Sequence, residues 1–205
     1  MPKQGQIYKN PQTGDEFEFL ETAKSSGGKR VVLKHKVYLK GELVPNHFHV
    51  LQDETFEVIS GKLTIWQDGK TSEIGAGQKI TLEKGIKHNH YNNSDEMIEY
   101  IHTIEPALDF DYLLENIIGL TIDGKMPNGK AGLAQELVTL KYLDSKSYLA
   151  DVPVGVQNLL MNTVAPIARL FGKRAIYKKY SDIEKWLLFI YKYNYIINKK
   201  EKLNF

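Results

Sequence analysis

Short stretches of alternating and β-branched residues, separated by turn residues, fill the first half of this 205-residue chain. The clearest of these stretches are residues 30–39, 55–59, 62–66 and 97–104. Ser60-Gly61 predicts a hairpin between two of them, and residues 67–70 predict another turn. Several short strands with frequent turns, and no long helical pattern, are typical of a β-sandwich or a β-barrel.

The second half of the chain carries helical patterns instead. Residues 109–118 open with acidic side chains, which suit a helix N-terminus, and residues 131–142 follow a loop of Pro, Asn and Gly. Residues 156–180 place apolar side chains on one helical face, and Pro166 should kink that helix or begin a new one. Residues 182–197 predict a last helix, capped by Asp182.

Composition excludes several kinds of site. The chain has no cysteine, which excludes disulfides, thiolate nucleophiles, iron–sulfur clusters and cysteine-ligated zinc. Lys and Arg total 27 and Asp and Glu total 25, for a net charge of +2, and this balance argues against a nucleic-acid-binding protein. Any metal in this chain must therefore be held by nitrogen and oxygen ligands.

Two close pairs of histidines supply such ligands. His47 and His49 are two residues apart, so in a strand both imidazoles point to one face. Glu54 follows five residues later, across a bend, and can add a carboxylate oxygen. His88 and His90 form the second pair and could add a third imidazole from another strand. Imidazoles together with a carboxylate are typical of a site for a divalent metal.

Both pairs lie in segments that resemble the two cupin motifs. Residues 41–61 fit every specified position of Gly-x5-His-x-His-x4-Glu-x6-Gly. Residues 77–92 fit Gly-x5-Pro-x-Gly-x2-His-x3-Asn except that Glu83 stands at the proline position. The two motifs are in the family's order and about as far apart as is usual in it. The resemblance covers roughly residues 30–106.

The resemblance implies a mainly β fold, a double-stranded β-helix or jelly-roll barrel, here followed by an α-helical extension. We expect the cupin barrel in residues 1–108 and the extension in residues 109–205, packed on the barrel or on a partner subunit. The family's metal ligands correspond to His47, His49, Glu54 and His88. These residues would hold one divalent transition metal per chain (Fe, Mn, Ni, Cu, Co or Zn) and leave one or two coordination positions open.

Strand alternation is the guide to where the other polar residues near the motifs point. His90 shares a strand face with His88, so it should point inward, either as an acid/base or substrate contact or as a residue that orients a ligand. The alternation at residues 97–104 does not decide whether Tyr100 and His102 face inward. Glu57 is out of phase with Glu54 and should face solvent, and His35, between two lysines, is expected at the surface.

The resemblance implies a metal-dependent enzyme acting on a small organic molecule, similar to dioxygenase-like or isomerase-like cupins. The alternative is a non-catalytic, metal-dependent protein that binds or senses a sugar-like ligand. No nucleic-acid partner and no transmembrane segment are expected, and by default the protein is taken as cytoplasmic. The basic C-terminal helices suggest packing on the barrel or on a partner, with contact to a membrane surface as the alternative. Analogy with the family predicts a homodimer.

Overall fold

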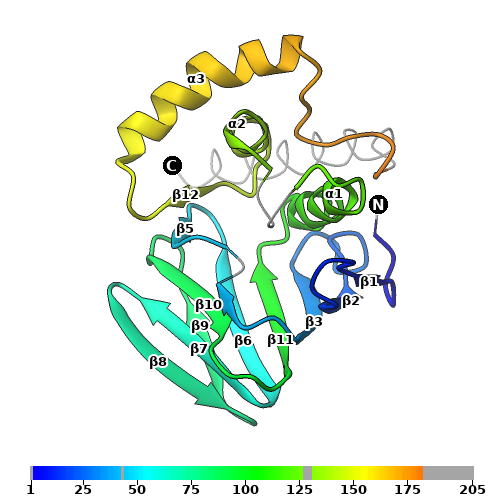
Figure 1. Cartoon of the computed structure of the whole chain (residues 1–205), viewed down its shortest axis with the longest axis vertical. Helices are drawn as coiled ribbons and strands as arrows, with labels where there is room; N and C mark the ends of the chain where they lie inside the picture. Colours follow the sequence, from blue (N-terminus) through cyan, green and yellow to red (C-terminus); the bar gives the residue numbers. More distant parts are fainter. Residues whose placement is uncertain (1, 43, 127–130, 182–205) are drawn as a thin grey trace, which may run out of the picture.

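Two antiparallel β-sheets face each other, and the helices lie over one end of them (Figure 1). The computed structural model describes residues 2–42, 44–126 and 131–181 of the chain. The first sheet has the order β1-β2-β3-β11-β6-β9, and the second has the order β12-β5-β10-β7-β8 with β4 beside β10. The strands are β1 (Ile7–Lys9), β2 (Glu16–Glu21), β3 (Val31–Val37), β4 (Gly41–Glu42), β5 (His47–His49), β6 (Asp53–Ser60), β7 (Lys62–Gln67), β8 (Lys70–Gly75), β9 (Lys79–Leu82), β10 (His88–Asn92), β11 (Ile98–Glu105) and β12 (Ser147–Leu149).

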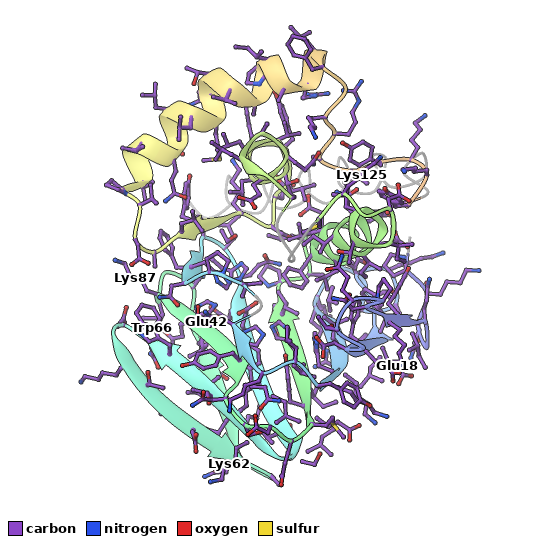
Figure 2. The ribbon with its side chains drawn as sticks, viewed as in Figure 1. Glu18, Glu42, Lys62, Trp66, Lys87 and Lys125 are labelled. Atoms are coloured by element: carbon purple, nitrogen blue, oxygen red, sulfur yellow. The ribbon has the colours of Figure 1, made fainter. Side chains whose placement is uncertain are left out.

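The space between the sheets is filled by alternate residues of their strands. In β11, Ile98, Tyr100, His102 and Ile104 are buried and the residues between them are more exposed. Ile98 and Tyr100 meet Leu63 and Ile65 of β7, together with Phe56 and Val58 of β6, in the barrel core. Figure 2 shows side chains filling the space between the sheets, with Lys62 at the end far from the helices and Lys125 beside the helical layer. The predicted mainly β jelly-roll is therefore confirmed.

The predicted hairpin at Ser60-Gly61 is wrong. Strand β6 pairs with β11 and β9, whereas β7 pairs with β10 and β8, so the chain crosses from one sheet to the other at this point. Two features require glycine at position 61. Its φ is +77°, a backbone conformation that other residues rarely adopt, and a Cβ there would lie 2.7 Å from Ile98 Cγ2. The other predicted turn is confirmed, because Asp68 and Gly69 both have positive φ and join β7 to β8 in a tight hairpin.

The described helices are α1 (Phe110–Ile122), α2 (Leu133–Tyr142) and α3 (Val154–Leu170). The predicted helix over residues 156–180 thus begins slightly earlier and stops at Leu170. Gly172, with φ +87°, ends it, and Lys173 N donates to Ala168 O in a Schellman arrangement. Pro166 lies inside α3 and does not begin a new helix. The helix predicted at residues 182–197 lies outside the described residues.

The extension is joined to the barrel through backbone pairing. Strand β12, from the extension, pairs with β5 of the barrel over three residues. At the start of α1, Asp109 does not cap the helix with its side chain; its carboxylate accepts hydrogen bonds from the backbone nitrogens of Asp144 and Ser145, both at 2.8 Å. Phe110 and Tyr112 of α1 then pack into a second apolar core with β2, β3 and β11. No helix in the described part of the chain is long and apolar enough to cross a membrane.

Gln157 anchors α3 through two hydrogen bonds to β12 and one to the segment that follows this strand. Its side chain accepts from Leu149 N and donates to Leu149 O and Val152 O, and it is 5% exposed. We expect Gln157→Leu to lower the free energy of unfolding by about 1–3 kcal/mol, because buried backbone groups lose their partners. Urea denaturation would measure this loss. Asn162→Leu, on the exposed side of the same helix, should change it by less than about 0.5 kcal/mol. Equal effects of the two substitutions would contradict the role given to Gln157.

Candidate metal centre

Three histidines converge because two neighbouring strands carry them. His47 and His49 lie at the two ends of β5, and His88 begins β10 directly opposite His47 in the antiparallel pair. The ring centroids of His47 and His88 are 4.6 Å apart, and those of His47 and His49 are 5.1 Å apart. The predicted same-face arrangement of His47 and His49 therefore brings both imidazoles to His88.

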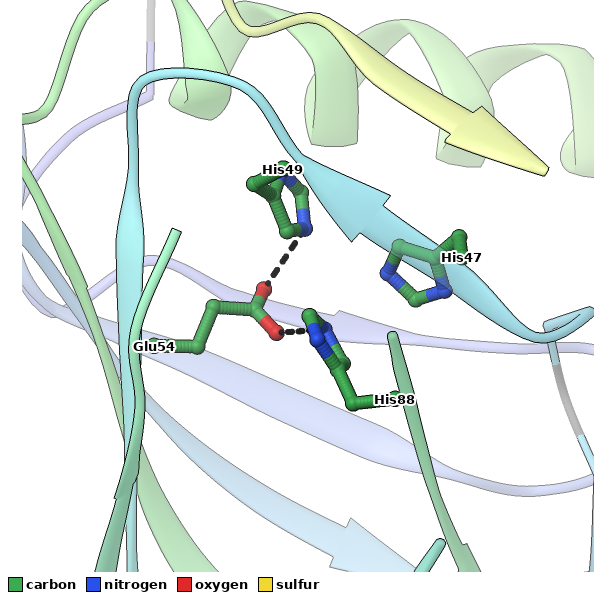
Figure 3. Close-up of side chains that lie close together, drawn as sticks. All are labelled: His47, His49, Glu54 and His88. Atoms are coloured by element: carbon green, nitrogen blue, oxygen red, sulfur yellow. Dashed lines mark hydrogen bonds and ion pairs between the residues drawn. The ribbon is translucent and has the colours of Figure 1, made fainter. Parts of the chain in front are cut away.

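Glu54 approaches the histidines from the opposite sheet. The chain bends after β5 and returns as β6, where Glu54 is 2% exposed. Its Oε2 lies 2.9 Å from His88 Nε2, and its Oε1 lies 3.2 Å from His49 Nε2 (Figure 3). One ligand atom from each of the four residues fits within a group 4.8 Å across. His47 is the least buried of the four, and the other three are buried.

Backbone carbonyls fix the tautomers of two of these histidines. His47 Nδ1 lies 2.8 Å from Pro45 O, and His88 Nδ1 lies 2.8 Å from Ile86 O. Because a carbonyl oxygen only accepts, both Nδ1 atoms carry the proton, and in the neutral rings both Nε2 atoms present a lone pair to the centre. This is the arrangement in which a backbone partner orients an imidazole for metal binding.

The charges around Glu54 shift the pKa values of the site. Burial alone would raise the pKa of Glu54, but His49 and His102 outweigh it and hold that pKa well below its usual range. Burial also opposes a charge on His88, but its hydrogen bond to Glu54 raises the pKa of His88. Burial lowers the pKa of His47 to about 4, so that ring is neutral at pH 7. The site thus holds a buried anion beside a neutral imidazole.

The four residues fit a divalent metal. Imidazole nitrogens and carboxylate oxygens are ligands that such metals accept, and one such atom from each of the four residues lies within 4.8 Å of the others. Both ring nitrogens of His49 are buried, Nδ1 has no hydrogen-bond partner among the described residues, and the polar contact of Nε2 is the one with Glu54 Oε1, so a metal would satisfy a nitrogen that is otherwise poorly paired. The set of three nitrogens and one carboxylate suits several transition metals and does not select one.

A fourth histidine, His102, also contacts Glu54. His102 Nε2 lies 3.2 Å from Glu54 Oε1, and the His102 ring stacks on Phe56 at 4.4 Å. The sequence left the inward face of β11 undecided. The polar residues Glu99, Thr103 and Glu105 all have the opposite parity to His102, and this was the signal that could have placed it inside.

His90 and His35 lie in the barrel interior beside His102. The His90 ring is 4.4 Å from that of Phe56 and 5.5 Å from that of His102, which confirms the predicted inward direction. The predicted surface position of His35 is wrong, because its ring stacks on Tyr100 at 4.9 Å and its Nε2 is buried. Lys34 and Lys36 point away from this face because neighbouring strand residues alternate.

Burial lowers the pKa of His35 to about 3 and the pKa of His90 well below its usual range. Both rings are therefore neutral at pH 7. Of the remaining polar residues, Glu57 is exposed as predicted.

The helical extension covers the site. Strand β12 pairs with the strand that carries two of the candidate ligands, and Ser147 lies opposite His49 while Leu149 lies opposite His47. The ring of Phe110, at the start of α1, is 6.3 Å from His49 and 6.1 Å from His102. The extension thus supplies both the outer edge of this sheet and an apolar wall beside the histidines.

Comparisons with known proteins agree with this architecture. Residues 35–104 match the family model described as Cupin domain. The chain is 24% identical over 138 residues to quercetin 2,3-dioxygenase of Bacillus subtilis (strain 168). The aligned segment covers 56% of this chain and 41% of the relative. It is also 24% identical over 101 residues to polyketide synthase CurC of Streptomyces cyaneus. This second aligned segment covers 49% of this chain and 66% of the relative. The chain thus spans less than two thirds of the length of these relatives.

Among solved structures, a predicted oxalate decarboxylase from Thermotoga maritima superposes with a TM-score of 0.44 and 19% identity, over 50% of this chain and 92% of that one. The family match falls on the segment that contains both histidine motifs and the strands that bring them together. Residues 35–104 of this chain are therefore a cupin domain.

Proposed function

We propose that His47, His49, Glu54 and His88 bind one divalent transition metal, and that the chain uses it as an enzyme on a small organic molecule. The observation that carries the proposal is the convergence of three imidazoles, two of them oriented by backbone carbonyls, and one buried carboxylate from three strands. When bound, the metal would act as a Lewis acid or a redox centre for a substrate or for dioxygen at its open positions. The native metal is one of Fe, Mn, Ni, Cu, Co and Zn.

The surrounding residues have separate tasks in this proposal. His102 contacts Glu54 Oε1, the oxygen that His49 also approaches, and keeps the carboxylate in place. Phe110 and the strand β12 limit the access of water from the side of the extension. His90 has a buried Nδ1 without a hydrogen-bond partner among the described residues, and its neutral ring can form a hydrogen bond with a polar group of the substrate.

The reaction is dioxygenase-like or isomerase-like in this proposal. The name of the relative from Bacillus subtilis supports a dioxygenase acting on a flavonol-type ring compound. That relative is much longer than the matched segment, so the substrate is tested directly with a panel of candidates.

The proposed function makes three predictions, and the first of them concerns the metal content of the purified protein. Purified without chelator, the protein should carry about one divalent ion per chain by elemental analysis. Glu54→Gln should weaken metal affinity by more than the roughly 10- to 100-fold that is usual for losing an outer partner. Glu57→Gln is a matched control on the same strand, since Glu57 faces solvent, and it should leave the affinity unchanged. Absence of metal from the wild-type protein, with no binding on titration, would rule out the site.

The second prediction concerns His102. His102→Phe keeps a ring against Phe56 but removes the nitrogen beside Glu54, so metal affinity should fall by about 10- to 100-fold. His102→Gln restores a donor in a similar position and should recover most of the affinity. Competition with a chelating dye measures the affinities, and the electron paramagnetic resonance spectrum of Mn²⁺-loaded protein reports the ligand geometry. An unchanged affinity in His102→Phe would show that His102 does not position Glu54.

The third prediction concerns turnover. Protein loaded with iron or manganese should consume dioxygen, or isomerise a substrate, with at least one member of a panel of flavonols, phenols and small acids. His49→Ala should abolish turnover while the thermal melt remains cooperative. Tight binding of a compound from the panel without any turnover would instead indicate the non-catalytic, ligand-sensing function.

A further inference from the structure

Helix α3 exposes an apolar stripe on the side away from the rest of the molecule. We call Val156, Leu159, Thr163, Ile167 and Leu170 the outer face of α3. Four of them are large apolar residues, with exposed fractions of 47%, 62%, 56% and 86% respectively. The opposite side of the helix, with Met161, Ala165 and Ala168, packs against α2. Figure 1 shows α3 as the outermost layer of the helical part, beyond α2.

The helix lacks the charges that a solvent-facing helix normally carries. Residues 154–168 contain no Asp, Glu, Lys or Arg, and the first charged residue, Arg169, lies with its guanidinium 4.3 Å from the ring centre of Tyr142. A helix that is apolar on both sides is typically buried on both sides. Large exposed apolar stripes of this kind mark interaction surfaces.

The outer face is symmetric about Thr163. Leu159 and Ile167 lie four residues before and after it, and Val156 and Leu170 lie seven residues before and after it. In an antiparallel pair of two such helices around a two-fold axis at Thr163, Leu159 of one copy meets Ile167 of the other, and Val156 meets Leu170. The hydroxyl of Thr163 donates to Leu159 O at 2.8 Å, so it is already satisfied and can be buried at the axis.

The charges at the two ends of α3 complement each other in the same arrangement. Asp151 is exposed just before the helix, and Lys173 and Arg174 are exposed just after it. Antiparallel pairing brings the acidic end of one helix to the basic end of the other, at both ends of the interface. An anionic membrane would be repelled by Asp151 at one end, so charges of both signs favour a protein partner with the same pattern.

We propose that the occupant of the outer face of α3 is a second copy of this chain, paired antiparallel through the two-fold axis at Thr163. The interface is isologous and buries the apolar stripe of each copy against that of the other. It lies on the far side of α3 from β12, so it is separate from the proposed metal site and from the activity proposed for it.

Analytical ultracentrifugation of the full chain tests this pairing. The wild-type protein should sediment at about twice 23.5 kDa. Leu159→Lys and Ile167→Glu, each alone, should weaken the dimer by roughly 30-fold or more, because each places two unpaired charges in the interface. An equimolar mixture of the two variants should regain association, since the heterodimer sets the new ammonium at position 159 against the new carboxylate at position 167.

The matched control is Leu133→Lys, which replaces a leucine of equal exposure (61%) at the start of α2 and should leave the wild-type mass unchanged. Circular dichroism confirms that all variants are folded. A monomeric wild-type protein at about 100 μM would overturn the proposal, whether or not it co-sediments with phosphatidylglycerol vesicles. So would a mixture of the two charged variants that stays monomeric, because the antiparallel register would then be wrong.

Discussion

A buried carboxylate surrounded by imidazoles is the constraint on which the centre of this molecule depends. Glu54 is almost fully buried, and His49, His88 and His102 all approach its oxygens within 3.2 Å. An ionised carboxylate in such a position is strongly destabilising unless positive charge compensates it. Protonation of His88 or a bound metal supplies that charge, so the same contacts that stabilise the fold also create affinity for a cation.

Much of this centre could be predicted from the sequence because strand geometry is regular. The two-residue spacing of His47 and His49 is sufficient to place them on one face, and the motif spacing identifies Glu54 and His88. The two lysines beside His35 favour a surface position for it, but alternation along β3 gives adjacent residues opposite environments, and His35 lies inside. Ser60-Gly61 predicts a hairpin from local residues alone, whereas the packing that excludes a Cβ at Gly61 comes from Ile98, a residue distant in sequence.

The extension was less predictable for a different reason. Strand β12 has only three residues and no alternation that would distinguish it from a loop, so its pairing with β5 could be found only in three dimensions. The sequence predicts one apolar helical face within residues 156–180, but which residues of α3 face α2 and which face outward depends on the position of α2. Long-range packing, which local patterns do not encode, decides both features.

The pairing of β12 with β5 also fixes the order in which the molecule can be completed. Strand β5 shares a single residue pair with β10 but three with β12, which lies about a hundred residues further along the chain. During synthesis the barrel strands through β11 leave the ribosome well before residues 147–149. The segment bearing His47 and His49 therefore acquires its main backbone partner last, and the nascent barrel carries an open edge at the point where the histidines meet until then.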